Sequence, residues 1–340
     1  MILENIDFGK FDAESESNIG EYFVDTGVFT KIKKGKKFLI LGRKGSGKTA
    51  LFKLATSEKI GRKMIDMDFS SYPWTVHASL KENGISPENA YLISCKFTFL
   101  VAICNEWAKN CKDKKLLNES KKIISRIYGT DEPNFFEWLI DKFKRIKKIK
   151  LPDISSGSLG AIELEDKETG FLSNTLSRWI DVLKEFVLSN FISEPITIKL
   201  DRLDDGWNSS EETKLIIIGI MKAAKEINLL LEIRDHPQTI VVFLRSDIYN
   251  ELRFNDKNKF NQHIEILEWS DEKLIEVASK RISKSLSLSC SSDEAWNNVF
   301  SQEPMRQSAK ISSYILKRTM GRPRDIIAFC HFCQEIAVQK

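Results

Sequence analysis

The stretch Phe38-Leu39-Ile40-Leu41-Gly42-Arg43-Lys44-Gly45-Ser46-Gly47-Lys48-Thr49-Ala50 decides the fold that we predict for this chain. It matches the phosphate-binding pattern G-x-x-x-x-G-K-[ST], also called Walker A, whose four fixed positions are filled by Gly42, Gly47, Lys48 and Thr49. The apolar run before the glycines predicts a buried strand, and the residues after them continue as a helix. A strand, a loop and a helix in this order are what the motif requires.

Each residue type in this loop suits a nucleoside triphosphate. Glycines at 45 and 47 let the backbone N–H groups and the positive end of the following helix face phosphate oxygens. Lys48 can reach the β and γ oxygens, and Thr49 can give its hydroxyl to Mg²⁺. We therefore expect Mg²⁺ and a nucleotide as cofactors. The expected nucleotide contacts are Gly42, Arg43, Lys44, Gly45, Ser46, Gly47, Lys48, Thr49 and Ala50.

The composition is that of a globular protein with room for more than one unit. Of its 340 residues, 42% are hydrophobic and 29% charged, so the chain can bury a sizeable core. A formal net charge of +4 is too small to indicate nucleic-acid binding by itself. No apolar run reaches the roughly 18–20 residues of a membrane span, and the acidic start predicts no signal peptide. We expect a cytoplasmic protein with no membrane partner, whose six cysteines are reduced.

A second motif of the Walker B kind follows a predicted strand at 196–201. This apolar strand runs into the acidic sequence Asp201-Arg202-Leu203-Asp204-Asp205. A P-loop enzyme needs a carboxylate at the end of a neighbouring strand to hold Mg²⁺ through its water shell, and Asp201 has that position. We therefore predict that Thr49 and Asp201 bind the metal ion. Asp204 and Asp205 are candidates to orient or deprotonate an attacking water.

Arginines at two further places are candidates for reading the state of the nucleotide. A predicted strand at 239–244 ends in Arg245, which is either linked to the nucleotide as a sensor or a salt-bridge partner of the acidic cluster. Near the C-terminus, Arg322 and Arg324 stand at the start of a helix. They can contact phosphate and report its loss, or an arginine can pair with Asp325 to cap the helix.

The chain divides into three predicted units. Residues 1–34 form a lead-in over the nucleotide site. Residues 35–268 form an α/β core, a three-layer sandwich with a mainly parallel sheet, which holds a helical and flexible insertion at about 72–170. Residues 269–340 show no strand pattern, so they predict a helical lid.

Several other residues raise alternatives that the sequence leaves open. Phe8 or Tyr22 can touch a nucleotide base, or they can simply pack the lead-in onto the core. The basic stretch Lys142–Lys150 suits a phosphate backbone or an acidic partner, and equally a solvated helix face. Arg234 and Arg253 are candidates for an arginine that acts across a subunit interface.

Together these elements resemble the bacterial P-loop ATPases related to the AAA+ and STAND classes, including the KAP-related kind. The resemblance rests on the loop at 42–49, the strands that end in Asp201 and Arg245, and the lid sequence 321–325. It implies an ATPase with a helical lid that self-associates and that is often encoded beside effector genes in antiphage defence systems. By the same resemblance, Arg324 is a second sensor and Arg245 lies at the first.

The sequence departs from the AAA+ pattern after Asp201. Standard AAA+ members have a glutamate there that activates water, whereas this chain has Arg202. The pattern is closer to STAND and KAP types, in which further acids, here at the positions of Asp204 and Asp205, can serve. We therefore expect slow hydrolysis, as suits a switch. The guanine-reading motif N-K-x-D is missing, because Asn258-Lys259 is followed by Phe260-Asn261, and ATP is favoured over GTP.

The expected function is that of an ATP-hydrolysing, oligomerising switch or motor that controls a separately encoded effector. A nucleic-acid remodelling or loading ATPase is one alternative, and it would use the basic stretch 142–150. A small-molecule kinase shares the P-loop. The alternative without enzyme activity is a nucleotide-bound scaffold that does not hydrolyse ATP.

Overall fold

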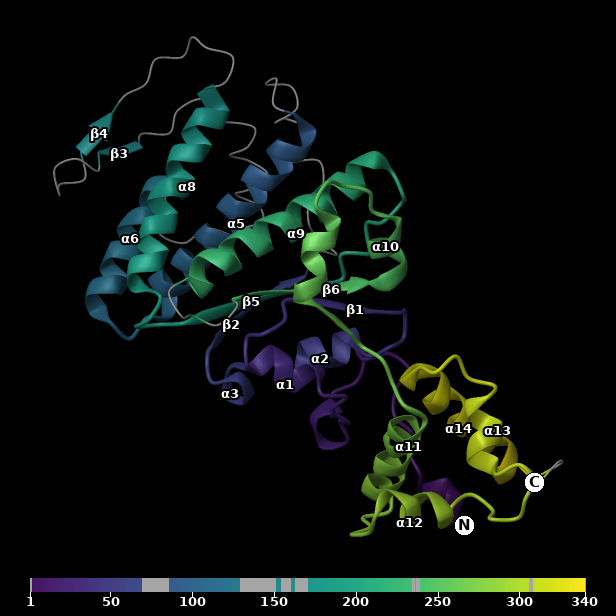
Figure 1. The fold of residues 1–340 in the computed structure, drawn as a ribbon. Coiled ribbons are helices and arrows are strands. Elements are labelled where there is room, and N and C mark those ends of the chain that lie inside the picture. The colour runs from purple at the N-terminus through teal and green to yellow at the C-terminus, as the bar shows by residue number, and fades with distance from the viewer. Residues whose placement is uncertain are drawn as a thin grey trace.

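The centre of the molecule is a sheet of five parallel strands with helices on both faces (Figure 1). The computed structural model describes residues 2–68, 86–128, 151–153, 160–162, 171–233, 236, 239–305 and 308–339. Across the sheet the strands are β2 (Lys63–Asp68), β5 (Ile196–Asp201), β6 (Ile240–Arg245), β1 (Leu39–Gly42) and β7 (Ile264–Ile266). The predicted α/β class with a parallel sheet is confirmed.

The strand register brings the predicted site residues to one edge of the sheet. Gly42, at the end of β1, lies opposite Arg245 at the end of β6. Asp201 ends β5, which pairs with β6 on its other side, so one strand separates it from the P-loop strand. Ligands of open parallel sheets bind beyond the carboxyl ends of the strands. The two predicted motifs therefore share the edge where a ligand would bind.

Different sets of helices cover the two faces of the sheet (Figure 1). One face carries α5 (Pro87–Asn110), α8 (Phe171–Asn190), α9 (Glu211–Glu232) and α10 (Ser246–Glu251). The other face carries α1 (Val28–Lys33), α2 (Lys48–Leu54) and α3 (Ser57–Ile60). Two short antiparallel strands, β3 (Leu151–Asp153) and β4 (Gly160–Ile162), lie apart from the main sheet. In the described part of the chain, no helix is long and apolar enough to cross a membrane.

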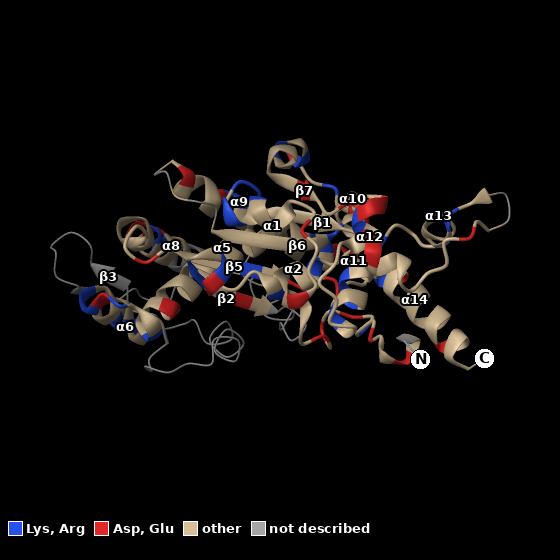
Figure 2. Cartoon of the chain, turned by 90° about the horizontal axis from the view of Figure 1, so that it is seen from below, with Lys and Arg blue, Asp and Glu red and all other residues tan. Residues whose placement is uncertain are grey.

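Residues 87–128 form two helices, α5 and α6. The chain leaves α5 at Cys111, which is extended, and α6 (Lys114–Tyr128) begins three residues later. Asp113 starts α6, because its carboxylate accepts hydrogen bonds from the backbone N–H groups of Lys115 and Leu116. Basic residues are exposed on α6, which lies away from the C-terminal helices (Figure 2).

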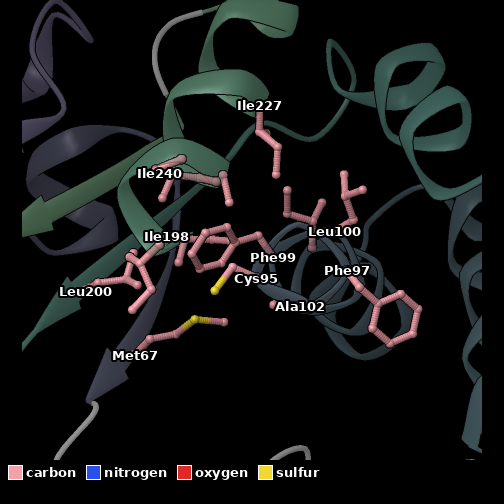
Figure 3. Packing of buried hydrophobic residues seen from close by; sticks show 14 of the residues in the cluster. Met67, Cys95, Phe97, Phe99, Leu100, Ala102, Ile198, Leu200, Ile227 and Ile240 are labelled. Carbon is pink, nitrogen blue, oxygen red and sulfur yellow. The ribbon is translucent and has the colours of Figure 1, made fainter. Parts of the chain in front are cut away.

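The middle of helix α5 is buried on all sides. Every residue from Phe97 to Cys104 is buried, which covers about two turns of the helix. The reason is that α5 packs against α6, α8 and α9 and also against the sheet, where Phe99 and Cys95 lie beside Ile198 (Figure 3). A helix that is apolar around its whole circumference belongs in the middle of a core.

The C-terminal region is helical, as predicted, and contains α11 (Asp271–Ser285), α12 (Ser292–Asn297), α13 (Ile311–Leu316) and α14 (Pro323–Val338). Ser270 caps α11 by accepting a hydrogen bond from Lys273 N. The apolar core of this lid also contains Ile6, Phe8 and Val24 from the lead-in. The two ends of the chain, with the short 3-10 helices η1 (Ile2–Asn5) and η2 (Ile19–Glu21), thus fold partly together.

We expect Gly219→Ala to destabilise the protein, although alanine normally favours a helix. A methyl group at Gly219 on α9 would lie 2.8 Å from Cβ and 3.0 Å from the carbonyl carbon of Tyr91 on α5. The helices must separate or lose contact, at a cost of about 1–3 kcal/mol in unfolding free energy. Urea unfolding measures this loss.

The matched control is Gly20→Ala. A methyl group there meets only the flexible end of Lys59, at 3.2 Å. It should leave stability unchanged or raise it slightly, because it restricts the unfolded chain. Equal stability of the Gly219→Ala variant and the native protein would contradict the close packing of α5 on α9.

Candidate functional site

The loop between β1 and α2 has the shape of a phosphate cradle. Gly45 and Gly47 have φ angles of 82° and 94°, in the left-handed region that glycine adopts without strain. The loop is closed by a hydrogen bond of 3.1 Å from Ser46 N to Arg43 O, and Lys48 begins α2. A side chain at Gly45 would also press on Arg324, whose Cβ would lie 3.3 Å from the added atom.

The Lys48 ammonium lies inside this loop. Its side chain is buried, and Nζ donates to Gly42 O at 3.0 Å and Arg43 O at 3.2 Å. Burial lowers the pKa of Lys48, and the nearby carboxylates of Asp204 and Asp201 oppose that shift. A positive charge is thus held out of water at the carboxyl edge of the sheet.

Asp201 places a buried carboxylate beside that charge. Burial raises its pKa to about 6, although hydrogen bonds from Arg202 N and the Thr49 hydroxyl, together with Lys48, act in the opposite direction. Among the described residues, its Oδ2 atom has no hydrogen-bond partner. A buried carboxylate oxygen without a partner costs free energy, so it marks a place where a cation or its water fits.

Thr49 and Asp201 are the protein groups available for such a cation. The described ranges contain no group of three or more His, Cys, Asp or Glu residues that could hold a metal ion alone. Mg²⁺ commonly binds through one or two protein ligands and completes its shell with water and phosphate. The donor set therefore fits Mg²⁺ together with a nucleotide.

The remaining acidic residues are divided between two arginines. Arg245 forms a two-point ion pair with Asp247, at 3.1 Å and 2.5 Å, and a longer contact of 3.5 Å with Asp204. Arg202 pairs with Asp205 at 2.5 Å. Arg245 thus forms a salt bridge with the acidic cluster, which is one of its two predicted roles. Among the carboxylates around Lys48, that of Asp204 does most to oppose the lowering of the Lys48 pKa.

The two lid arginines take different positions. Arg324 lines the cavity beside the P-loop, and its Nε donates to Phe11 O at 3.1 Å. Arg322 forms a two-point ion pair with Asp325, at 2.7 Å and 2.9 Å, and donates to Lys44 O at 3.1 Å. Arg322 therefore occupies the N-cap position of α14 without a capping hydrogen bond from its side chain, which contacts Asp325 and the P-loop instead. Arg324 lines the cavity.

A cavity of about 880 Å³, including its open mouth, lies between the core, the lead-in and the lid. Its lining combines residues of the P-loop and the start of α2 with residues of the lead-in and the C-terminal helices. From the P-loop and α2 these are Gly45, Gly47, Lys48, Thr49 and Ala50, and from the other segments they include Tyr22, Phe23, Val24, Thr26, Val277, Arg281 and Ile327.

Three cations of α11 hold the lead-in against this cavity. Lys273 donates to Asp25 O at 2.6 Å, Lys280 to Phe23 O at 2.9 Å and Arg281 to Phe8 O at 2.9 Å. The sequence analysis did not identify these residues as part of the site. Their partners are backbone carbonyl groups, which every residue has, so the sequence does not indicate these contacts.

The two aromatic candidates of the lead-in lie in different surroundings. Tyr22 lines the cavity, and its ring packs 4.2 Å from the guanidinium carbon of Arg281. Burial and a hydrogen bond to Glu16 raise the pKa of Tyr22. Phe8 is buried in the core of the lid.

Trp269 is a further site residue that the sequence analysis missed. It lies in the connection between β7 and α11, and its indole N–H donates to Ser46 O in the P-loop at 2.8 Å. The ring also packs against the lid core. A single side chain thus joins the phosphate loop to the start of the lid.

Two predicted interaction elements fall largely outside the described residues. The basic stretch 142–150 lies there, and so does Arg234. Arg253 is exposed in the segment that follows α10.

Comparison with known families finds a match for the C-terminal helices. Residues 272–340 match the FunZ-associated C-terminal helical domain, from the first turn of α11 to the end of the chain. The match hints at a defence-system-like protein, and no P-loop ATPase family matches the chain. Neither a curated protein nor a solved structure matches it.

The raised pKa of Asp201 predicts a pH-dependent effect of Asp201→Asn in the metal-free protein. The unfolded carboxyl titrates near 3.8 and the folded one near 6, so the native chain loses stability at this site as pH rises from about 4 to 6. The variant lacks this loss. The difference in unfolding free energy, variant minus native protein, should therefore rise by up to about 3 kcal/mol between pH 4 and pH 6 and stay constant at higher pH.

Urea unfolding at pH 4, 5, 6 and 8 measures this difference. The comparison between variant and native protein cancels the titration of the other carboxylates. A constant difference from pH 4 to pH 8 would show that water reaches Asp201, against the buried carboxylate described above.

Proposed function

We propose that this chain is a P-loop ATPase of the AAA+ and STAND-like kind, which binds Mg²⁺ and ATP in the cavity between core and lid. The main support is the convergence of Lys48, Thr49 and Asp201 at the carboxyl edge of the sheet, two of them buried. Lys48 and Thr49 begin α2 after β1, Asp201 ends β5, and together they supply the groups that a magnesium triphosphate needs. The parallel sheet with helices on both faces is compatible with such a fold.

Each protein group has a role in this proposal. Lys48 and the loop N–H groups would bind phosphate, and Thr49 and Asp201 would hold Mg²⁺, which supplies neutralisation of the developing charge on the phosphates when it is bound. Asp204 is the better candidate for orienting the attacking water, because Arg202 already engages Asp205. Arg245, paired with Asp204, would keep that carboxylate in place.

We further propose that nucleotide state is passed to the lid and from there to a partner. Arg324 beside Gly45 and Trp269 on Ser46 O connect the phosphate loop to the lid. A change in the loop would therefore alter the lid angle. The match of the lid to the FunZ-associated C-terminal helical domain hints at a defence-system-like protein. This supports a switch that self-associates and controls a separate effector, with Arg253 as a candidate contact across subunits.

One observation favours nucleic acid as a second candidate partner. The exposed residues of α6 include five basic ones, namely Lys114, Lys115, Lys121, Lys122 and Arg126. A helix face of this kind suits a phosphate backbone. Stimulation of ATP hydrolysis by DNA, lost on reversing the charge of Lys121 and Lys122, would support a remodelling ATPase.

Lys48→Ala should reduce the release of phosphate from ATP by at least about a hundredfold, because it removes a buried charge that would bind the transferred phosphoryl group. Lys36→Ala, which removes an exposed lysine shortly before the loop, is the matched control and should keep native turnover. A phosphate-release assay measures both.

Light-scattering mass with ADP and with a slowly hydrolysed ATP analogue tests self-association in the same preparation. A rise in mass with the analogue, absent in Lys48→Ala, supports the switch. ATP binding without turnover or mass change would instead indicate a scaffold that does not hydrolyse ATP.

The two acids after Asp201 should differ in their effect on catalysis. Asp204→Asn should lower the turnover number by about 10²–10⁴-fold, as for loss of a group that transfers or orients a proton. Asp205→Asn should lower it far less, since Asp205 is paired with Arg202. Both variants should retain ADP affinity in calorimetry. The reverse order of effects would assign the water to Asp205.

A further inference from the structure

Part of the cavity lining outside the P-loop is apolar. It includes Phe23, Val24, Val277 and Ile327. Apolar surfaces of this kind suit the flat face of a nucleotide base. Thr26 lines the same cavity and brings a hydroxyl group to it.

The hydroxyl of Thr26 is buried and has no hydrogen-bond partner within the described part of the protein. A buried hydroxyl without a partner raises the free energy of the folded protein, and a single hydrogen bond to the hydroxyl would remove this cost. Thr26 is also one of the residues that line the cavity. The site therefore contains an unused polar group where a ligand can supply the missing partner.

The backbone around Thr26 is held on both sides. The Asp25 carboxylate accepts hydrogen bonds from Gly27 N at 2.8 Å and Phe29 N at 3.2 Å, which fixes the start of α1. Lys273 of the lid holds Asp25 O at 2.6 Å. The position of the Thr26 backbone is thus set before any ligand binds, which lowers the cost of binding.

We infer that Thr26 is the residue that reads the nucleotide base, through a hydrogen bond between its hydroxyl and the polar edge of adenine. This inference rests on the proposed function, since it requires a nucleotide with its phosphates at Lys48 and Thr49. The cavity that contains those two residues continues to Thr26. A nucleotide with its phosphates in the loop would extend its base toward this wall.

The chemistry of the wall favours adenine over guanine. A hydroxyl can accept a hydrogen bond from the exocyclic amine of adenine or donate one to a ring nitrogen. Guanine carries more polar groups on the same edge, and each group left without a partner in an apolar pocket lowers affinity. One hydroxyl on an apolar wall therefore matches the base with fewer polar groups.

The test compares Thr26→Val, which replaces the hydroxyl by a methyl group, with Thr26→Ser, which keeps it. Calorimetry would measure binding of Mg-ADP, Mg-GDP and tripolyphosphate to each protein. We expect Thr26→Val to weaken ADP about three- to tenfold, leave tripolyphosphate unchanged, and reduce the preference for ADP over GDP. Thr26→Ser should retain ADP affinity.

Thermal unfolding without ligand separates a binding role from a structural one. Because the hydroxyl has no partner there, Thr26→Val should unfold at the same or a higher temperature than the native protein. Unchanged ADP affinity in Thr26→Val, or equal weakening of ADP and tripolyphosphate, would overturn the inference while leaving the ATPase proposal intact. Native protein that binds neither ADP nor tripolyphosphate would overturn the proposed function itself.

Discussion

The carboxylate of Asp201, held out of water beside the Lys48 ammonium, is the arrangement on which the rest of the site depends. Opposite charges in a poorly solvated place attract strongly, but each loses its hydration. Here the attraction does not fully offset the loss of hydration, because burial raises the pKa of Asp201 and lowers that of Lys48 despite their mutual attraction. The protein keeps this unfavourable pair at the edge of a sheet whose three central strands, β5, β6 and β1, are almost entirely buried. A cation and a phosphate group would satisfy both residues at once, and that is why the pair supports a nucleotide site more strongly than the loop alone.

The sheet order explains how two distant motifs reach this place. The P-loop follows β1 and Asp201 follows β5, with β6 between them carrying Arg245. Because the strands are parallel, their carboxyl ends meet along one edge, and the intervening strand supplies the arginine that organises the acidic cluster. The helices α5 and α9 stabilise this order from one face, through a contact close enough to require Gly219.

The sequence was sufficient for features that depend on local patterns. The P-loop, the strand into Asp201, the cap at Ser270 and the helical lid were predictable, because each rests on a few adjacent residues with a fixed chemical role. Contacts between distant segments were not predictable. The burial of α5 on all sides, the separation of Arg322 from Arg324 and the hydrogen bond from Trp269 to Ser46 depend on which helices lie next to one another. Thr26 could not be identified from the sequence at all, because its hydroxyl is notable for lacking a hydrogen-bond partner, and no sequence pattern shows such a lack.

The sharing of one apolar core by the lead-in and the lid has a consequence for the synthesis of the protein. Phe8 emerges among the first residues of the chain, yet the side chains that bury it come from α11 and α14, more than 260 residues later. The central sheet can form as soon as β7 is complete, but the cavity can close only after Ile327 has been made. A chain made only as far as β7 therefore has all the strands of the central sheet but lacks the part of the cavity wall that α11 and α14 supply.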